Sequence, residues 1–241
     1  MDLPATRHSM IAAVRSDIAD VRRSGFETLV TVYWKPVYKY LRVKWNVPGD
    51  DAQDVTQAFF ARAIEKGFFD AYDPAKARFR TFLRLCLDRF LANERKASAR
   101  LKRGGGLRIV PIDFENAEGE LRHHDAAVPA GLDAYFHREW IRSLLALSVD
   151  DLRMEYERAG KAVQFRVFEI YDLEAPQSGA ETTYREIAAA LGISATDVTN
   201  YLSAARRTFR RLLLDRLRTI CGDADEFEAE ARQLLRGGFR T

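Results

Sequence analysis

Side chains that can hydrogen-bond to nucleic-acid bases and phosphates follow one another along residues 195–214. Small polar residues come first and arginines later, and those expected to face outward are Thr196, Thr199, Asn200, Ser203, Arg206 and Arg207. Hydroxyl and amide groups read base edges in the major groove, whereas guanidinium groups bind both base edges and phosphates. The order therefore suits a helix whose first turns meet bases and whose later turns meet the DNA backbone. An ordinary solvated helix face is the alternative interpretation.

A second set of polyanion-binding groups lies on the helix expected over residues 79–102. One outer face presents four polar residues at spacings of four, three and four: Arg89, Asn93, Lys96 and Arg100. No acidic residue occurs between Glu94 and Asp113, although six basic residues do. A solvated helix end could carry such charge, but an acid-free run beside a patterned face favours a polyanionic partner.

An acidic face is expected on the helix over residues 50–66. Asp51, Asp54 and Gln57 lie near one another on it, and the apolar stripe of the same helix includes Phe60. Acidic residues in a first turn complement the helix dipole, which is a purely structural reason for Asp51. That reason fits Asp54 and Gln57 less well, so this face could dock on a basic partner helix.

The elements that position the first set are predicted by local signals. Thr183 and Glu186 match a capping box at a helix start, and Gly192 supplies a residue that tolerates positive φ at the helix end. Ser194 and Asp197 repeat the capping pattern at the start of the next helix. A short helix, a turn with glycine and a longer helix are typical of a helix-turn-helix motif, whose second helix enters the major groove.

Aromatic residues in the segment 67–78 have two interpretations. Phe68, Phe69 and Tyr72 are surrounded there by polar and turn-forming residues. Some of these rings are expected in the core. An aromatic ring on a loop can also stack on an unpaired base.

Composition excludes several classes of protein. The 241 residues are 47% hydrophobic and 30% charged, with a formal net charge of +3, so any nucleic-acid surface must come from local clustering. Two cysteines far apart do not form a disulfide framework, and the four histidines lack metal-ligand spacing. No apolar run is long enough for a membrane span, and the first residues lack a signal peptide, so a cytoplasmic protein is expected. We find no catalytic cluster, metal site or cofactor motif, and expect no enzyme.

The periodicity predicts an all-α protein of two small helical domains joined by a linker. The expected segments are an N-terminal domain over 1–106, a linker over 107–132, a helix-turn-helix domain over 133–220 and an acidic C-terminal extension over 221–241.

Four stretches together resemble bacterial RNA polymerase sigma factors of the extracytoplasmic-function type, in a subgroup with an extended linker and a C-terminal tail. They are YWKPVYKYLR (33–42), DDAQDVTQAFFARAIEK (50–66), ARFRTFLRLCLDRFLANERKASARLKRGGG (77–106) and TTYREIAAALGISATDVTNYLSAARRTFRRLLLDRL (182–217). The resemblance covers nearly the whole chain. It implies a domain similar to sigma region 2, a domain similar to sigma region 4, and a role in promoter recognition and strand opening.

The resemblance also implies partners and residue roles. Core RNA polymerase, through its β′ and β subunits, would bind Asp51, Asp54, Gln57 and Phe60. The −10 element would meet Arg89, Asn93, Lys96 and Arg100, and the loop 67–78 would hold a flipped base. The −35 element would meet Thr196, Thr199, Asn200, Ser203, Arg206 and Arg207. Promoter DNA, both duplex and melted, is thus an expected partner, and an anti-sigma factor is a further one that the family allows.

Two departures from the family pattern leave the promoter sequence open. Gln53-Asp54 stands where the family commonly has Glu-Asp, and Thr199-Asn200-Tyr201 stands where it commonly has a set such as Lys-Ser-Arg. The main alternative function is a stand-alone helix-turn-helix regulator whose N-terminal half senses a ligand or dimerises. A nucleic-acid-modifying enzyme would need a catalytic cluster that the sequence does not contain.

Overall fold

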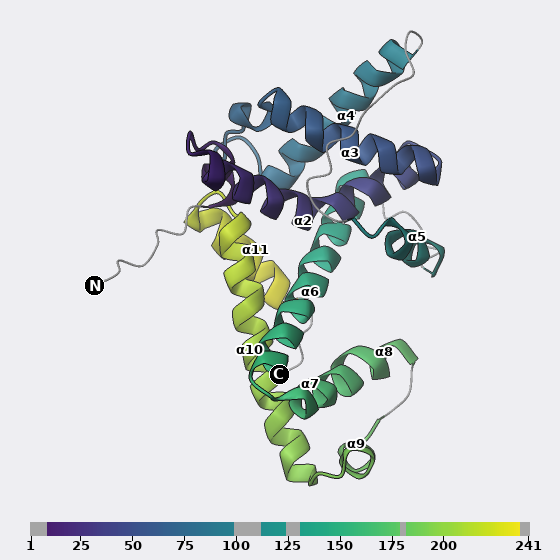
Figure 1. Ribbon diagram of the computed structural model, residues 1–241, viewed down its shortest axis with the longest axis vertical. Coiled ribbons are helices and arrows are strands. Elements are labelled where there is room, and N and C mark those ends of the chain that lie inside the picture. The colour runs from purple at the N-terminus through teal and green to yellow at the C-terminus, as the bar shows by residue number, and fades with distance from the viewer. Residues whose placement is uncertain (1–8, 99–111, 124–130, 179–181, 237–241) are drawn as a thin grey trace, which may run out of the picture. The chain divides into compact units, whose positions relative to one another are not determined.

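The computed structural model is built from helices, and the described part of the chain contains no strand (Figure 1). The structure describes residues 9–98, 112–123, 131–178 and 182–236. Its helices are α1 (Met10–Val14), α2 (Ala19–Lys44), α3 (Gly49–Glu65), η1 (Phe68–Ala71), α4 (Phe79–Ser98), α5 (Phe114–His123), α6 (Leu132–Arg158), α7 (Ala162–Phe168), η2 (Glu169–Glu174), α8 (Ala175–Ser178), α9 (Tyr184–Leu191), α10 (Ala195–Ile220) and α11 (Ala224–Arg236). The predicted all-α class is confirmed.

The chain forms two compact units. Unit 1 comprises Met1–Ser143 and Leu217–Thr241, and unit 2 comprises Leu144–Arg216. The boundaries fall within α6 and within α10, so the units do not coincide with the segments expected from sequence. The reason is that the first turns of α6, the end of α10 and all of α11 contribute to the packing of unit 1.

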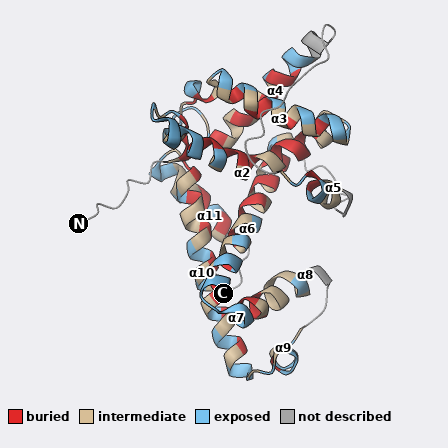
Figure 2. Cartoon of the chain, in the orientation of Figure 1, coloured by how far each residue is buried: buried red, intermediate tan, exposed pale blue. Residues whose placement is uncertain are grey.

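Aromatic side chains dominate the core of unit 1. The rings of Tyr33 and Phe69 each meet Phe79 with 5.6 Å between centroids, and Phe59 meets Phe90 at the same distance. Edge-to-face contacts of this kind add about 0.5–1.5 kcal/mol per pair to the gain from burial. Figure 2 shows the buried residues along α2, α3 and α4. These contacts hold α4 and the preceding loop against α2.

Helix α5 lies in the stretch expected to be a linker, and that expectation is corrected for residues 114–123. Two of its carboxylates bind α2: Glu118 accepts from Arg42 at 2.6 Å, and Glu120 accepts from Lys35 at 2.8 Å. Phe114 adds an aromatic contact, with its ring 5.1 Å from that of Tyr38. Ion pairs between distant segments do not produce a periodic pattern of apolar residues in the sequence. The sequence pattern therefore did not predict this helix.

The start of α6 is fixed to unit 1 by a buried ion pair. Lys39 donates to Glu139 at 2.8 Å, and both side chains are almost completely buried. The hydroxyl of Ser143 donates to the carbonyl of Val32 at 2.9 Å. Buried charges need such partners. Each member of the pair has a second one, since Glu139 also binds Arg142 at 2.6 Å and Lys39 also binds Glu120 at 2.5 Å.

The acidic C-terminal extension also belongs to unit 1. It forms α11, on which Ala231 and Leu234 are buried. Its carboxylates reach the first turn of α4, where Glu226 accepts from the backbone N–H of Phe79 at 3.4 Å.

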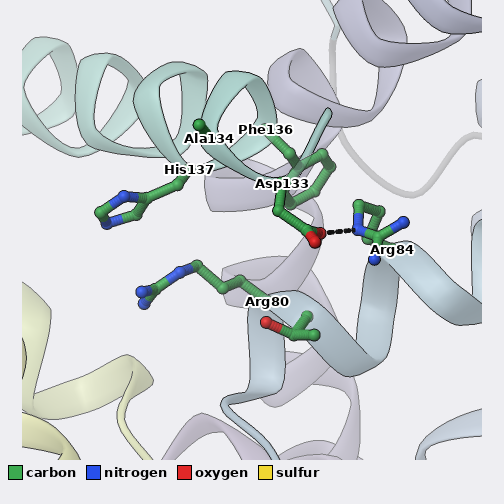
Figure 3. Close-up of a pocket in the computed structure, with 7 residues that line it drawn as sticks. Arg80, Arg84, Asp133, Ala134, Phe136 and His137 are labelled. Carbon is green, nitrogen blue, oxygen red and sulfur yellow. Dashed lines mark ion pairs between the residues drawn. The ribbon is translucent and has the colours of Figure 1, made fainter. Parts of the chain in front are cut away.

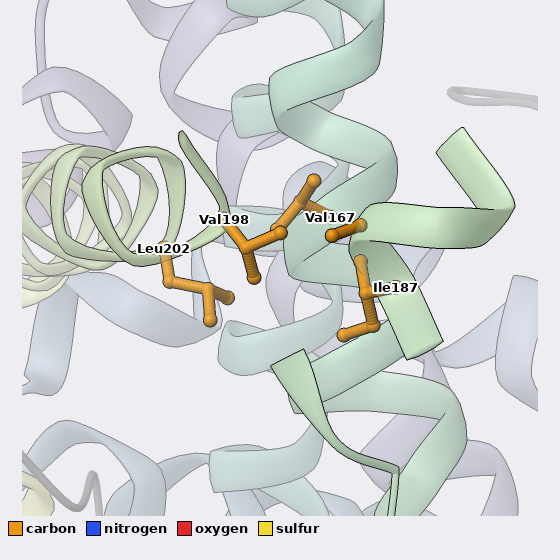
Figure 4. Packing of buried hydrophobic residues seen from close by; sticks show 5 residues of the cluster. Val167, Ile187, Val198 and Leu202 are labelled. Carbon is orange, nitrogen blue, oxygen red and sulfur yellow. The ribbon is translucent and has the colours of Figure 1, made fainter. Parts of the chain in front are cut away.

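Unit 2 packs α9 and α10 on the helix that α7 begins. Its small core contains Val167, Ile187, Ala188, Val198 and Leu202 (Figure 4). Helix α7 continues through a π-helical stretch, η2, into α8. The core therefore joins the two helices of the motif to a third helix that precedes them.

Candidate nucleic-acid interface

Helices α9 and α10 have the local geometry of a helix-turn-helix motif. Thr183 and Glu186 form the capping box at the start of α9, and Gly192 ends that helix with φ +66°. Ser194 and Asp197 exchange hydrogen bonds of 3.1 Å and 3.0 Å at the start of α10. At each helix start two backbone N–H groups, those of the N-cap residue and of the third helical residue, thus have a side-chain oxygen acceptor. The predicted caps and the predicted glycine turn are confirmed.

The outward face of α10 presents most of the predicted DNA-binding residues to solvent. Its exposed members are Thr196, Thr199, Asn200, Ser203 and Arg207. The opposite face carries the buried Val198, Leu202, Ala205 and Phe209. Because a helix turns by about 100° per residue, positions 196, 200, 203 and 207 fall within one narrow strip. This strip holds hydroxyl and amide groups near its start and a guanidinium farther along.

Arg206 departs from the predicted set because it is half-buried and bound within unit 2. Its Nε and Nη2 donate to the two carboxylate oxygens of Asp172 at 3.0 Å and 2.8 Å. Its guanidinium lies 5.5 Å from the ring centroid of Tyr171. Hydrogen bonding to Asp172 raises the pKa of Arg206. In this structure Arg206 therefore joins α10 to η2, and its contact with DNA stays a prediction.

The predicted face on α4 is described in part. Arg89 and Asn93 are exposed. Lys96 lies within α4, but its side chain is outside what the structure describes, and Arg100 lies outside the described residues altogether. The inner side of α4 carries the buried Phe79, Leu83, Leu87, Phe90 and Leu91.

The same face of α4 continues toward the start of the helix, which the sequence reasoning missed. Arg78 is exposed, Phe82 is half-buried, and Leu85 is 41% exposed. With Arg89 they follow one another at spacings of four, three and four residues, so they share one side of α4. The signal was present in the sequence, because the spacing of three and four residues that selects Arg89 and Asn93 also selects these residues when it is continued toward the N-terminus. We call these residues, with Asn93, the α4 face.

The acidic face predicted on α3 is largely exposed. Asp51 and Asp54 are exposed and Gln57 is half-buried. Phe60 is only 2% exposed, and its ring lies 5.2 Å from that of Phe59. Phe60 thus belongs to the apolar stripe that fixes α3 to the core, and its contact with a partner stays a prediction.

The loop before α4 is bound by the guanidinium of the residue that follows α1. Arg15, just after α1, donates to the backbone carbonyl of Phe69 at 2.8 Å and to that of Asp70 at 3.0 Å. Phe69 and Tyr72 are buried, whereas Phe68 is half-buried. Of the three rings expected in this loop, two are therefore core, and Phe68 alone retains an accessible edge.

The described residues contain no group of three or more His, Cys, Asp or Glu side chains that could hold a metal ion. Cys86 and Cys221 are unpaired, and burial raises the pKa of the Cys86 thiol to about 11. Among the described helices, none has both the length and the apolar composition needed to cross a bilayer.

Comparison with models of known families, with curated proteins and with solved structures found no match for this chain.

Proposed function

We propose that this protein is an RNA polymerase sigma factor that recognises promoter DNA with α10 and holds an opened strand with the α4 face. The observation that carries the proposal is the exposed strip on α10, which stands on a capped helix-turn-helix. Thr196, Asn200 and Ser203 lie where base edges would be read, and Arg207 follows where phosphate would be met.

The α4 face supports a second contact of a different kind. It combines cationic and amide groups with the half-buried ring of Phe82 and the exposed Leu85. A positive surface that also offers aromatic or apolar contacts is typical of proteins that bind single strands. A sigma factor needs such a surface beside its duplex-reading helix, because it must hold a strand after the duplex opens.

The acidic residues on α3 support docking to a larger basic partner. Asp51 and Asp54 are exposed on a helix that is fixed from beneath by the buried Phe59 and Phe60. Nonspecific binding of DNA by one basic module gives dissociation constants of about 10⁻⁴ to 10⁻⁶ M. Joining two weak DNA contacts on one polymerase makes the second contact intramolecular, at effective concentrations of order mM. The polymerase partner thus gives both DNA-binding surfaces useful affinity.

The deciding experiment mixes the full chain with bacterial core RNA polymerase. A sigma factor should co-elute with the core enzyme in size-exclusion chromatography and direct run-off transcription from genomic promoter fragments. A stand-alone helix-turn-helix regulator would bind duplex DNA but would not co-elute, which would contradict the proposal.

The docking face is tested by Asp54→Arg. We expect it to weaken core binding by at least about tenfold, because a like charge opposite a basic helix costs on the order of a kcal/mol or more. The matched control is Glu27→Arg, which makes the same change of charge at an exposed position of α2. Equal core affinity of the two variants would refute the acidic docking face.

A further inference from the structure

Helix α11 places two carboxylates at the first turn of α4. Glu226 accepts from the backbone N–H of Phe79, and Glu230 binds the guanidinium groups of both Arg78 and Arg80. Glu230 is almost completely buried. These contacts lie within unit 1 and join its last helix to the start of the α4 face.

The start of α4 is an unusually positive place for a helix N-terminus. Unsatisfied N–H groups give a helix start a partial positive charge, and basic side chains there are unfavourable without an anion. Arg78 and Arg80 flank Phe79, and α6 adds His137, whose Nε2 lies 3.8 Å from Glu230 Oε2. Figure 3 shows Arg80 and His137 extending from their helices toward the same space. An anion is therefore required here, and α11 supplies it.

The carboxylate at the centre of this cluster stays charged. Burial alone would raise the pKa of Glu230, but the nearby His137, the hydrogen bond from Arg80 and the charges of Arg80 and Arg78 outweigh it and hold that pKa below its ordinary value. One carboxylate thus receives two guanidinium groups, an arrangement that a phosphate group could equally accept.

Arg78 is shared between this cluster and the α4 face. It is the first residue of the series that continues through Phe82, Leu85, Arg89 and Asn93 on one side of the helix. Arg78 remains 42% exposed, whereas Glu230 covers its charged end. A strand lying along the α4 face would bring its backbone phosphate to the position that the Glu230 carboxylate holds.

We propose that α11 is an intramolecular competitor of single-stranded DNA, with Glu226 and Glu230 occupying the phosphate position at the start of the α4 face. The inference rests on the proposed function, because it assigns a regulatory contact to the surface that holds the opened strand. Binding of a strand along all of the α4 face requires α11 to release Arg78. The free protein is then restrained from binding single strands until α11 is displaced.

The test compares two full-length variants that remove the same number of charges from α11. E226Q/E230Q removes the carboxylates at α4, and D225N/E228Q removes two exposed carboxylates elsewhere on the same helix. Binding of a fluorescein-labelled 12-nucleotide single-stranded DNA is measured by anisotropy at low salt. E226Q/E230Q should bind about tenfold more tightly than wild type, because the binding-competent fraction of the protein rises. D225N/E228Q should change affinity much less.

A double-mutant cycle assigns the gain to the start of α4. Adding Arg78→Gln to E226Q/E230Q should remove most of the tenfold gain, because the released guanidinium is the group that meets the phosphate. A gain of equal size in D225N/E228Q, or a gain that survives Arg78→Gln, would overturn the proposal in favour of a general effect of charge.

A reversible lock gives an independent test that keeps both carboxylates. A Cβ placed on Gly222 would lie 3.6 Å from the Cβ of Pro74, a separation suited to a disulfide. In a C221S background, P74C/G222C should bind single-stranded DNA about tenfold more weakly when oxidised than when reduced, because the bond holds α11 closed. Equal affinity of the two redox states would overturn the inference.

Duplex binding, measured in parallel on every variant, separates the two proposals. Unchanged single-strand affinity together with intact duplex binding would overturn the role of α11 alone. Failure of wild type and all variants to bind either form of DNA would contradict the proposed function itself.

Discussion

Replacing Arg206 should destabilise unit 2 without the selective loss of DNA binding that an outward-facing arginine would produce. The side chain makes two charge-assisted hydrogen bonds to Asp172 and lies over Tyr171. Both partners of the ion pair keep roughly a quarter of their side-chain surface in solvent. Allowing for that exposure, we expect the pair to contribute about 1–2 kcal/mol, and the contact with the ring about 0.5–1 kcal/mol more.

The assay for Arg206→Ala uses the distribution of tryptophan. Trp34, Trp45 and Trp140 all lie in unit 1, so their fluorescence reports that unit, whereas far-ultraviolet circular dichroism reports both. In urea, the circular dichroism signal of Arg206→Ala should be lost at a lower denaturant concentration than that of wild type. The midpoint of its fluorescence transition should change much less. The expected drop in melting temperature of unit 2 is about 10 °C, since 1 kcal/mol shifts a unit of this size by about 4–8 °C.

Arg207→Ala is the matched control, because the neighbouring arginine is exposed on the outward strip. It should leave stability unchanged, weaken duplex binding and reduce the slope of log affinity against log salt by about 0.9, the effect of one lost phosphate contact. A double-mutant cycle of Arg206→Ala with Asp172→Ala should give a coupling energy of about 1 kcal/mol. A coupling energy near zero, or a loss of duplex affinity in Arg206→Ala that matches Arg207→Ala, would refute the structural role of Arg206.

Three further outcomes are expected from unit 1 and the helix caps. Lys39→Met should cost about 3 kcal/mol in urea unfolding because the buried Glu139 then keeps Arg142 as its cationic partner but loses the buried one, and K39M/E139L should recover most of that loss. Thr183→Ala should cost about 1 kcal/mol of unit 2 stability through the lost cap, and an unchanged circular dichroism midpoint would contradict this. Burial alone would raise the pKa of Glu120, but hydrogen bonds from Lys35 and Lys39 hold it below the ordinary value of 4.5. Its stabilisation is therefore complete above that pH and lost as pH falls through the lower folded-state pKa, a loss that Glu120→Gln should abolish.

Local chemistry made the motif in unit 2 predictable from sequence. A capping box, a glycine with positive φ and a second cap each depend on residues within four positions of one another, so Thr183, Gly192 and Ser194 carry their signal in the local sequence. The buried stripe of α4 was predictable for the same reason, because helical periodicity is visible in one segment. DNA-facing roles remain a prediction, since exposure of Asn200 or Arg89 does not identify a ligand.

Contacts between distant segments were not predictable in this way. Arg206 follows the helical pattern of a DNA-facing residue, but its partner Asp172 lies 34 positions earlier and is presented by a π-helical stretch. Glu230 meets Arg80 across 150 positions. Phe60 was predicted both in the apolar stripe and on the docking face. Its ring contact with Phe59 shows that it lies in the stripe. A sequence pattern gives the side of a helix on which a residue lies, but not which other helix covers that side.

On the proposed function, pairing of arginines with carboxylates also sets which guanidinium groups are available to a polyanion. With 38 basic and 35 acidic residues the chain has little net attraction for DNA, so nonspecific binding depends on which cations remain accessible. Asp172 holds Arg206 at the edge of the α10 strip, and Glu230 holds Arg78 at the edge of the α4 face. Each pair withdraws one guanidinium from phosphate binding, while Arg207 and Arg89 stay exposed. If the protein binds DNA as proposed, these acidic residues lower the salt-dependent, sequence-independent part of the affinity, so that base contacts on α10 would form a larger share of what remains. It follows that Asp172→Asn and Glu230→Gln should both raise affinity for random-sequence DNA and steepen its salt dependence, and a variant that raised affinity without changing the salt slope would contradict this account.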